Sequence, residues 1–198
     1  MGLDGKTLSS IQVSRNLLKL KLCNSELDFS VLVFVTQFRG LKELVLTGNS
    51  FYGSRDIVTL GVNHEGITTI EALEENDTMV PLQANYNLQS LAIYKNSFDG
   101  EDIQLSLFSK VIPCLKALRH LIIPSNGFKS PGVARQLSNC LTSTESGFPG
   151  HLESLNIGNN LFSPGNLLSL CRVALVSGKV PRLKKLVIAF SDLGSQSE

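Results

Sequence analysis

The eleven residues LKELVLTGNSF, at positions 41–51, recur with the same skeleton three more times in this chain of 198 residues. The copies are LQSLAIYKNSF (88–98), LRHLIIPSNGF (118–128) and LESLNIGNNLF (152–162). All follow the frame L-x-x-L-x-L-x-x-N-x-(L/F), with Ile allowed at the sixth position. Two looser copies, LLKLKLCNSEL (17–27) and LKKLVIAFSDL (183–193), have serine at the asparagine position. A frame repeated in this way predicts a stack of similar structural units.

The spacing within the frame indicates a short strand followed by a turn. Leucine-type residues at positions one, four and six are expected to point into the core, and position eleven turns inward again to close the layer. The asparagine at position nine lies where the chain leaves the strand, and an amide there can bond the backbone of neighbouring turns. We therefore expect these residues to form a structural asparagine ladder: Asn49, Asn96, Asn126 and Asn160.

The segments that follow the asparagine are long enough for helices. The frames start at residues 17, 41, 88, 118, 152 and 183, so the steps between them are 24, 47, 30, 34 and 31 residues. Segments 102–108 and 133–141 carry apolar residues at three- and four-residue spacing, which is typical of an amphipathic helix. Ser130-Pro131 and Ser163-Pro164 match an N-cap followed by proline at the first helical position. Each unit is therefore predicted to hold one strand and one helix, which is an α/β fold.

These frames and helical segments resemble the ribonuclease-inhibitor-like subfamily of leucine-rich repeats, the type found in ribonuclease inhibitor, NOD-like receptors, the Ran GTPase activator, capping-protein regulators and tonsoku-like repair scaffolds. The resemblance covers residues 17–193. It implies a solenoid curved into a horseshoe, with a parallel β-sheet on the concave side and helices on the convex side. The irregular steps depart from the more regular ribonuclease inhibitor.

The chain divides on this basis into a repeat domain at residues 17–193 and two short flanks. Residues 1–16 resemble the helical back half of a preceding repeat or an N-terminal cap, and residues 194–198 form a tail. Terminal units of a repeat stack need polar capping surfaces. Neither flank offers a cysteine-rich cap, so we expect the chain to be a subunit or fragment of a larger assembly.

The step of 47 residues leaves segment 52–87 with two interpretations. One is a degenerate repeat anchored by Ile67 and Ile70, and the other is a repeat helix with an inserted loop. The insertion is favoured because the degenerate frame would place Ala72 at its sixth position and Glu75 at its ninth. The acidic side chains of the segment predict a solvated excursion.

Composition and motifs exclude several functional classes. The formal net charge of +1 predicts no overall attraction to nucleic acid or to an anionic membrane. No apolar run approaches the roughly 20 residues that span a bilayer, and the first residues lack a signal-peptide core. We therefore expect a cytoplasmic or nuclear protein. The four cysteines are at least 26 residues apart and form no paired motif, so reduced thiols are expected rather than a metal site or disulfides.

No enzymatic constellation is evident. The three histidines His64, His120 and His151 lie in different repeats, and none belongs to a metal or nucleophile motif. Neither phosphate-binding glycine frame occurs. The sequence therefore predicts a protein that is not an enzyme and that has no cofactor.

Charge is distributed unevenly over the predicted sheet. Positions two, three, five, seven and eight of each frame should project from the concave face. Seven of these residues are basic (Lys19, Lys21, Lys42, Lys95, Arg119, Lys184 and Lys185) and two are acidic (Glu43 and Glu153), which gives +5. The rest of the chain then holds 11 basic and 15 acidic residues, or −4. This polarity favours an acidic partner.

Position five adds a mostly apolar file formed by Val45, Ala92, Ile122 and Val187. An apolar row rimmed by charge is typical of a protein-binding surface, so we expect a non-catalytic scaffold for protein–protein interaction with an acidic, partly apolar partner. The residues expected to contact that partner are Lys42, Tyr94, Lys95, Arg119, Ile122, Lys184, Lys185 and Phe190.

Three alternatives stay open. The first is a nucleic-acid-associated scaffold of the repair or chromatin type, although the face offers fewer arginines and stacking aromatics than such a surface uses. The second is a regulatory or autoinhibitory arm like that of NOD-like receptors. The third is a substrate-receptor arm of a ubiquitin ligase, which would need an adaptor-binding motif that these residues do not contain.

Overall fold

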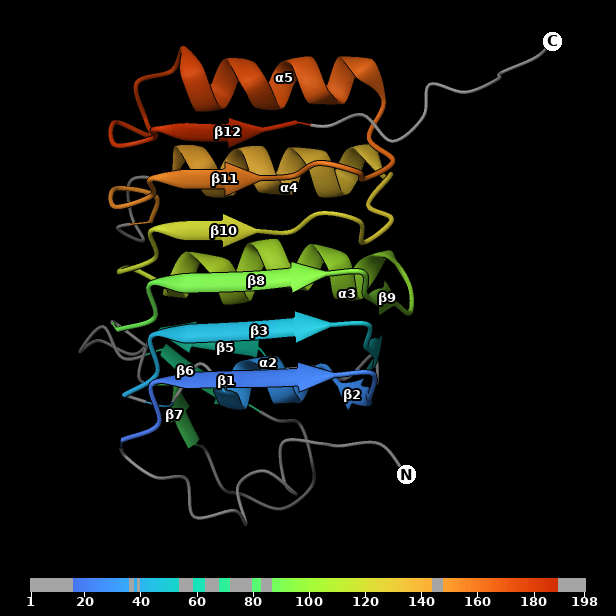
Figure 1. Cartoon of the computed structure of the whole chain (residues 1–198), viewed down its shortest axis with the longest axis vertical. Coiled ribbons are helices and arrows are strands. Elements are labelled where there is room, and N and C mark those ends of the chain that lie inside the picture. The colour runs from blue at the N-terminus through green and yellow to red at the C-terminus, as the bar shows by residue number, and fades with distance from the viewer. Residues whose placement is uncertain are drawn as a thin grey trace, which may run out of the picture.

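The computed structural model describes residues 16–35, 38, 40–53, 59–62, 68–71, 80–82, 87–143 and 148–188. Each of the six frames contributes one strand to a parallel sheet, and the strands follow one another in chain order (Figure 1). They are β1 (Lys19–Cys23), β3 (Glu43–Thr47), β8 (Ser90–Tyr94), β10 (His120–Ile122), β11 (Ser154–Asn156) and β12 (Lys185–Val187). Every pair is in register by frame position, because the leucines of neighbouring frames must align to share one core.

Two smaller sheets accompany the main one. Strands β2 (Glu26–Asp28), β4 (Ser50–Tyr52) and β9 (Ser97–Phe98) form a parallel ribbon directly after the turn. Strands β5 (Thr59–Val62), β6 (Thr68–Glu71) and β7 (Val80–Leu82) form an antiparallel sheet within segment 52–87. Among the described residues, this antiparallel sheet pairs with neither of the other two.

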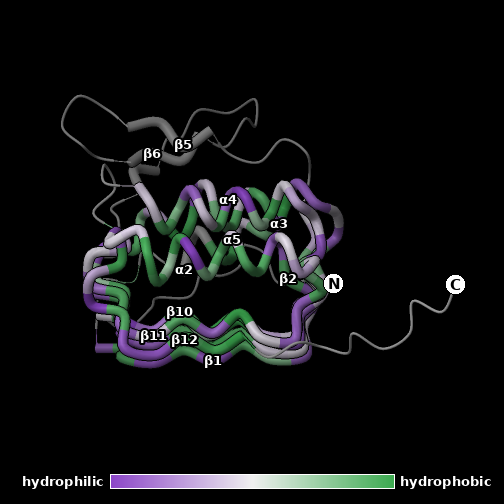
Figure 2. The backbone as a smooth tube through the Cα atoms, turned by 90° about the horizontal axis from the view of Figure 1, so that it is seen from above, coloured by the Kyte–Doolittle hydropathy of each residue, from purple (hydrophilic) through white to green (hydrophobic). Residues whose placement is uncertain are grey.

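The helices form a second layer behind the main sheet, as Figure 2 shows in a view along the stack. They are α2 (Ser30–Val35), α3 (Glu101–Ser106), α4 (Pro131–Thr142) and α5 (Pro164–Leu175). The two expected N-caps are confirmed, because Ser130 Oγ accepts from Gly132 N and Ser163 Oγ accepts from Asn166 N. Helix α3 continues as a π-helical turn, η1 (Leu107–Val111), and a 3-10 turn, η2 (Ile112–Cys114).

The core lies between the two layers and is built from the repeated positions. In the frames that start at 41, 88, 118 and 152, the residues at positions one, four, six, nine and eleven are all buried. The phenylalanines at position eleven stack from coil to coil, with ring centroids 5.0 Å apart for Phe51 and Phe98 and 5.4 Å apart for Phe98 and Phe128. In the first and last frames, positions one, four and six are only half-buried.

The asparagines at position nine connect the coils through buried hydrogen bonds. Asn126 Nδ2 donates to the carbonyl oxygens of Ile93 and Ile123 at 2.8 and 2.9 Å, and its Oδ1 accepts from Asn96 N at 3.1 Å. Asn49 N donates in the same way to Asn96 Oδ1 at 3.0 Å, and Asn126 N donates to Asn160 Oδ1 at 2.9 Å. Each side chain therefore satisfies backbone groups that no strand partner reaches.

The expectation of a mixed α/β fold with a parallel sheet is confirmed. The horseshoe curvature and the ribonuclease-inhibitor-like subfamily stay predictions. The flank at 194–198 and all but the last residue of the flank at 1–16 lie outside the described residues. No helix in the described part of the chain is long and apolar enough to cross a membrane.

Candidate protein-binding surface

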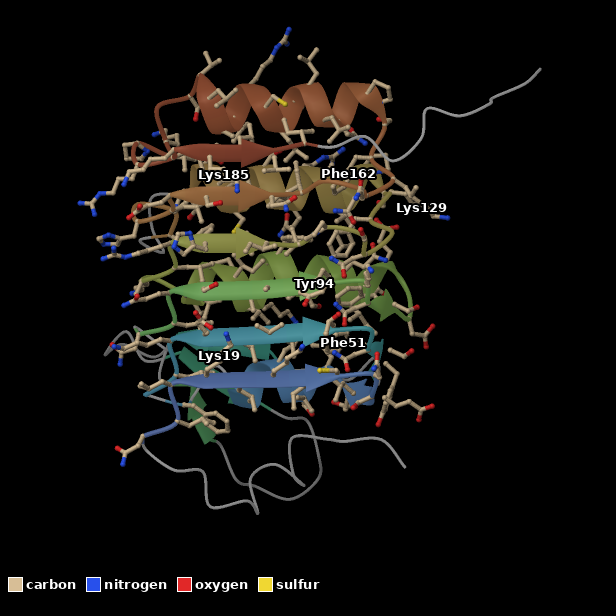
Figure 3. The ribbon with its side chains drawn as sticks, in the orientation of Figure 1. Lys19, Phe51, Tyr94, Lys129, Phe162 and Lys185 are labelled. Carbon is tan, nitrogen blue, oxygen red and sulfur yellow. The ribbon has the colours of Figure 1, made fainter. Side chains whose placement is uncertain are left out.

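The surface of interest is the side of the main sheet that faces away from the helices. It is made by positions two, three, five, seven and eight of the frames and is called the outer face below. Because side chains alternate along a strand, the residues between the buried leucines point to this side. Figure 3 shows three of its members, Lys19 on β1, Tyr94 on β8 and Lys185 on β12, spread across the sheet.

Three of the seven basic residues of the outer face form ion pairs with its two glutamates. Lys19 Nζ lies 2.6 Å from Glu43 Oε2 on the next strand. Lys184 Nζ lies 2.8 Å from Glu153 Oε2, and Arg119 Nη1 lies 3.5 Å from Glu153 Oε1. The Lys184 hydrogen bond lowers the pKa of the Glu153 carboxyl below its ordinary value, and the charges of Lys184 and Arg119 add to this effect. Arg119 and Lys184 therefore share one counter-ion within the chain, and the three side chains together keep a net charge of +1.

Four other lysines form no ion pair with any described residue. They are Lys21 on β1, Lys42 just before β3, Lys95 just after β8 and Lys185 at the start of β12, and all four are exposed. A cation with no internal counter-ion keeps its charge available to an approaching partner. These residues surround the middle of the outer face on different sides.

Position eight has an unusual backbone conformation in every frame that the structure describes there. The φ angles are positive at Asn24 (53°), Gly48 (66°), Lys95 (57°), Ser125 (59°) and Asn159 (54°). Glycine and asparagine tolerate this left-handed region, whereas lysine adopts it at a cost. Lys95 therefore lies in the turn rather than on the strand, and its side chain projects from the rim of the outer face.

The apolar file at position five lies in the centre of the outer face. Val45, Ala92 and Ile122 occupy consecutive strands in direct register. Val45 and Ile122 are half-buried, Ala92 is 8% exposed, and Tyr94 at position seven of β8 is half-buried beside them. On β11 the file is interrupted by Asn156, whose Oδ1 accepts from Gly158 N at 3.0 Å. Phe190, the remaining expected contact, lies outside the described residues.

Leu18, at position two of the first frame, is a large apolar side chain of the outer face and is 55% exposed. Four others that are more than half exposed occur elsewhere, and the sequence-based prediction missed them. Leu161, Leu168, Leu175 and Val176 are each more than half exposed, and all belong to the coil that contains α5. Leu168 and Leu175 are seven residues apart and share one face of α5. The sequence alone could have revealed this apolar helix face, because α4 carries the polar residues Arg135 and Thr142 at the equivalent positions. The exposed side of α5 is thus more apolar than the exposed side of α4.

The His and Cys side chains in the described part of the chain are the remaining candidates for a metal site. No cluster of three or more His, Cys, Asp or Glu side chains is arranged to hold a metal ion there. All four cysteines are free, and burial raises the pKa of the Cys140 thiol. His151 Nδ1 lies 3.0 Å from Arg182 Nη1 at the surface.

No family model matches the chain, and no curated protein matches it. Among solved structures, the chain is similar to an internalin (inlF) from Listeria monocytogenes str. 4b F2365, with 18% sequence identity and a TM-score of 0.38. The match covers 90% of this chain and 44% of that chain, so this chain spans less than half the length of the internalin. A similarity this distant carries no information about what the chain binds.

Proposed function

We propose that the chain is a non-catalytic protein-interaction module that recognises an acidic, partly apolar protein surface through its outer face. The observation that supports this proposal is a set of four lysines, none of which forms an ion pair with a described residue, around a central apolar file. Such a file gives the partner apolar area to bury, and the surrounding lysines attract acidic side chains and set the orientation.

The test is affinity purification from native lysate, with protein identification by mass spectrometry. The informative variant changes Lys42, Lys95 and Lys185 to Glu together. The matched control changes three exposed basic residues outside the outer face, Lys129, Arg135 and Lys179, to Glu, so that the net charge of the two proteins is equal. We expect acidic partners to be lost from the first variant and kept by the control, while the melting temperatures of both stay close to that of the wild type. Equal retention by both variants would contradict the proposal.

Arg119 and Lys184 were expected to contact the partner, but they suit this test poorly. Changing either to Glu would place a second carboxylate beside Glu153 and would remove the ion pair that lowers its pKa. A loss of binding would then be mixed with a local rearrangement of β10, β11 and β12. We propose that both residues act with Glu153 as a polar border of the binding surface.

The wider setting of this function is also a proposal. We infer a horseshoe-shaped leucine-rich repeat domain of the ribonuclease-inhibitor-like type at residues 17–193, with an insertion within 52–87. Strands and helices that alternate along the chain support the domain, and the separate antiparallel sheet of β5, β6 and β7 supports the insertion. We further infer that the protein acts in the cytoplasm or nucleus as part of a larger assembly. Exposed apolar residues on the α5 coil support that last inference.

Nucleic acid is the alternative partner for a face with seven basic residues. Binding to duplex DNA would weaken steeply with salt, by about 0.9 log units per neutralised phosphate for each log unit of salt. We expect no such binding at physiological salt, because the face offers one arginine among its seven basic residues and one tyrosine, fewer than such a surface uses. A steep salt dependence of duplex binding that the triple lysine variant abolishes would favour the alternative.

A further inference from the structure

The chemistry of the outer face restricts which kind of protein element can cover it. The backbone N–H and C=O groups of the central strands are used within the plane of the sheet, by parallel pairing on both sides. An extended peptide laid on the face would find no backbone partners there, and its own polar groups would lose water. The element that covers an apolar file on this face must therefore satisfy its own backbone, as an α-helix does.

The spacing of the apolar file matches the repeat of a helix. Val45, Ala92 and Ile122 lie at equivalent positions on three adjacent strands, β3, β8 and β10. Adjacent strands are about 4.8 Å apart, so the file spans about 10 Å. A helix advances about 5.4 Å per turn, so a helix that lies across the strands meets roughly one strand per turn. Apolar residues at i, i+4 and i+7 of such a helix would each face one residue of the file.

Two lysines that form no ion pair with the described part of the chain flank the file on opposite sides at equal sequence distance. Lys42 precedes Val45 by three residues, and Lys95 follows Ala92 by three residues. Three residues of extended chain span about 10 Å, so each lysine backbone lies about 10 Å from the file, on opposite sides of it. A helix is about 10–12 Å across with its side chains, so a helix centred on the file fits between the two lysines. Glu43, which follows Lys42 in the sequence, is paired with Lys19 rather than with either of these lysines.

Resting on the proposed function, we propose that the partner element is an acidic amphipathic helix that lies across β3, β8 and β10. Its apolar stripe contacts Val45, Ala92 and Ile122, with Tyr94 beside it. Acidic residues on one flank of the helix meet Lys42, and those on the other flank meet Lys95. The interruption of the file by Asn156 limits the apolar contact to about two to three helical turns.

The proposal is tested with synthetic peptides and the whole chain of 198 residues. The probe is a fluorescein-labelled 18-residue peptide with Leu at i, i+4 and i+7, Glu on both flanks and Ala elsewhere, and binding is measured by fluorescence anisotropy. One control peptide carries Pro at its centre, which breaks the helix, and a second carries Lys in place of Glu. We expect the probe to bind the wild type, the Pro peptide to bind about tenfold more weakly, and the Lys peptide not to bind.

Variants of the chain assign the contacts. Lys42→Glu and Lys95→Glu should each weaken binding of the acidic probe by about tenfold, and the double variant should prefer the Lys peptide. Lys129→Glu, outside the outer face, should leave binding unchanged. No binding of the probe to the wild type, or equal binding of the probe and the Pro peptide, would overturn the helix proposal. The proposed function would survive that result if lysate partners were still lost from the triple lysine variant.

Discussion

Replacing Asn126 by alanine is expected to destabilise the fold more than any substitution of an exposed residue in the same coil. The change removes the acceptor of Asn96 N and one acceptor of Asn96 Nδ2, and it removes a donor to the Ile93 carbonyl. Ile123 O keeps its bond from Asn160 Nδ2 at 2.8 Å. Asn96 Nδ2 keeps its bond to Leu46 O at 3.1 Å, so two buried groups, Asn96 N and the Ile93 carbonyl, lose the Asn126 partner. At about 1–3 kcal/mol each, the loss is about 2–6 kcal/mol in the free energy of unfolding. A small domain has about 5–15 kcal/mol in total.

The assay is urea unfolding followed by far-UV circular dichroism, with the free energy taken from the midpoint and slope. Asn139→Ala is the control, because Asn139 is exposed on α4 and its side chain makes one hydrogen bond to the described residues, from Nδ2 to Gln136 Oε1 at 3.3 Å. It should stay within about 0.5 kcal/mol of the wild type. Asn126→Asp should be as damaging as alanine at neutral pH and should recover as pH falls, because burial favours the neutral acid. Equal losses for Asn126→Ala and Asn139→Ala would refute the reasoning.

Three further outcomes follow from individual side chains. Lys95→Asn should raise the free energy of unfolding by about 1 kcal/mol, because asparagine tolerates the positive φ that lysine adopts at a cost, and urea midpoints check this. Gly48→Ala should destabilise more than Gly127→Ala: both glycines have positive φ, but only the Cβ added at Gly48 would lie 2.3 Å from Asn24 Oδ1. Glu153→Gln should lower the melting temperature at neutral pH, and the difference from the wild type should vanish on acidification. The depressed folded pKa of Glu153 means that its stabilisation is present above the ordinary carboxyl pKa and is lost as pH falls through the folded value. A difference that persists below about pH 3 would contradict that assignment.

The sequence predicted the main sheet well because the repeat leaves little freedom. Once one frame is a strand, the others must align leucine to leucine, which sets the parallel register of all six strands. The π-helical turn at Leu107–Val111 lies beyond such reasoning, because no frame position constrains it and Pro113 interrupts the hydrogen bonding that follows. The ribbon of β2, β4 and β9 was also missed. It arises because positions ten and eleven of stacked coils come close enough to pair, which a single frame does not reveal.

The net charge of the outer face was predictable from the sequence, and so was part of its ion pairing. Adding the charges at the projecting frame positions gave a net charge of +5. The pairing of Arg119 and Lys184 with Glu153 could be predicted as well, since all three occupy position two of successive repeats.

Lys95 is different, because its significance depends on a backbone angle that only the structure supplies. Asn24, Gly48 and Asn159 show that the turn accepts residues suited to positive φ. A lysine at this position lowers the local stability and forms no ion pair with a described residue that would offset the cost. Natural proteins keep such strain where a side chain serves another purpose. The expected gain in stability of Lys95→Asn, together with a loss of acidic-helix binding by the same protein, would tie that strain to recognition; a gain in stability with binding intact would separate the two.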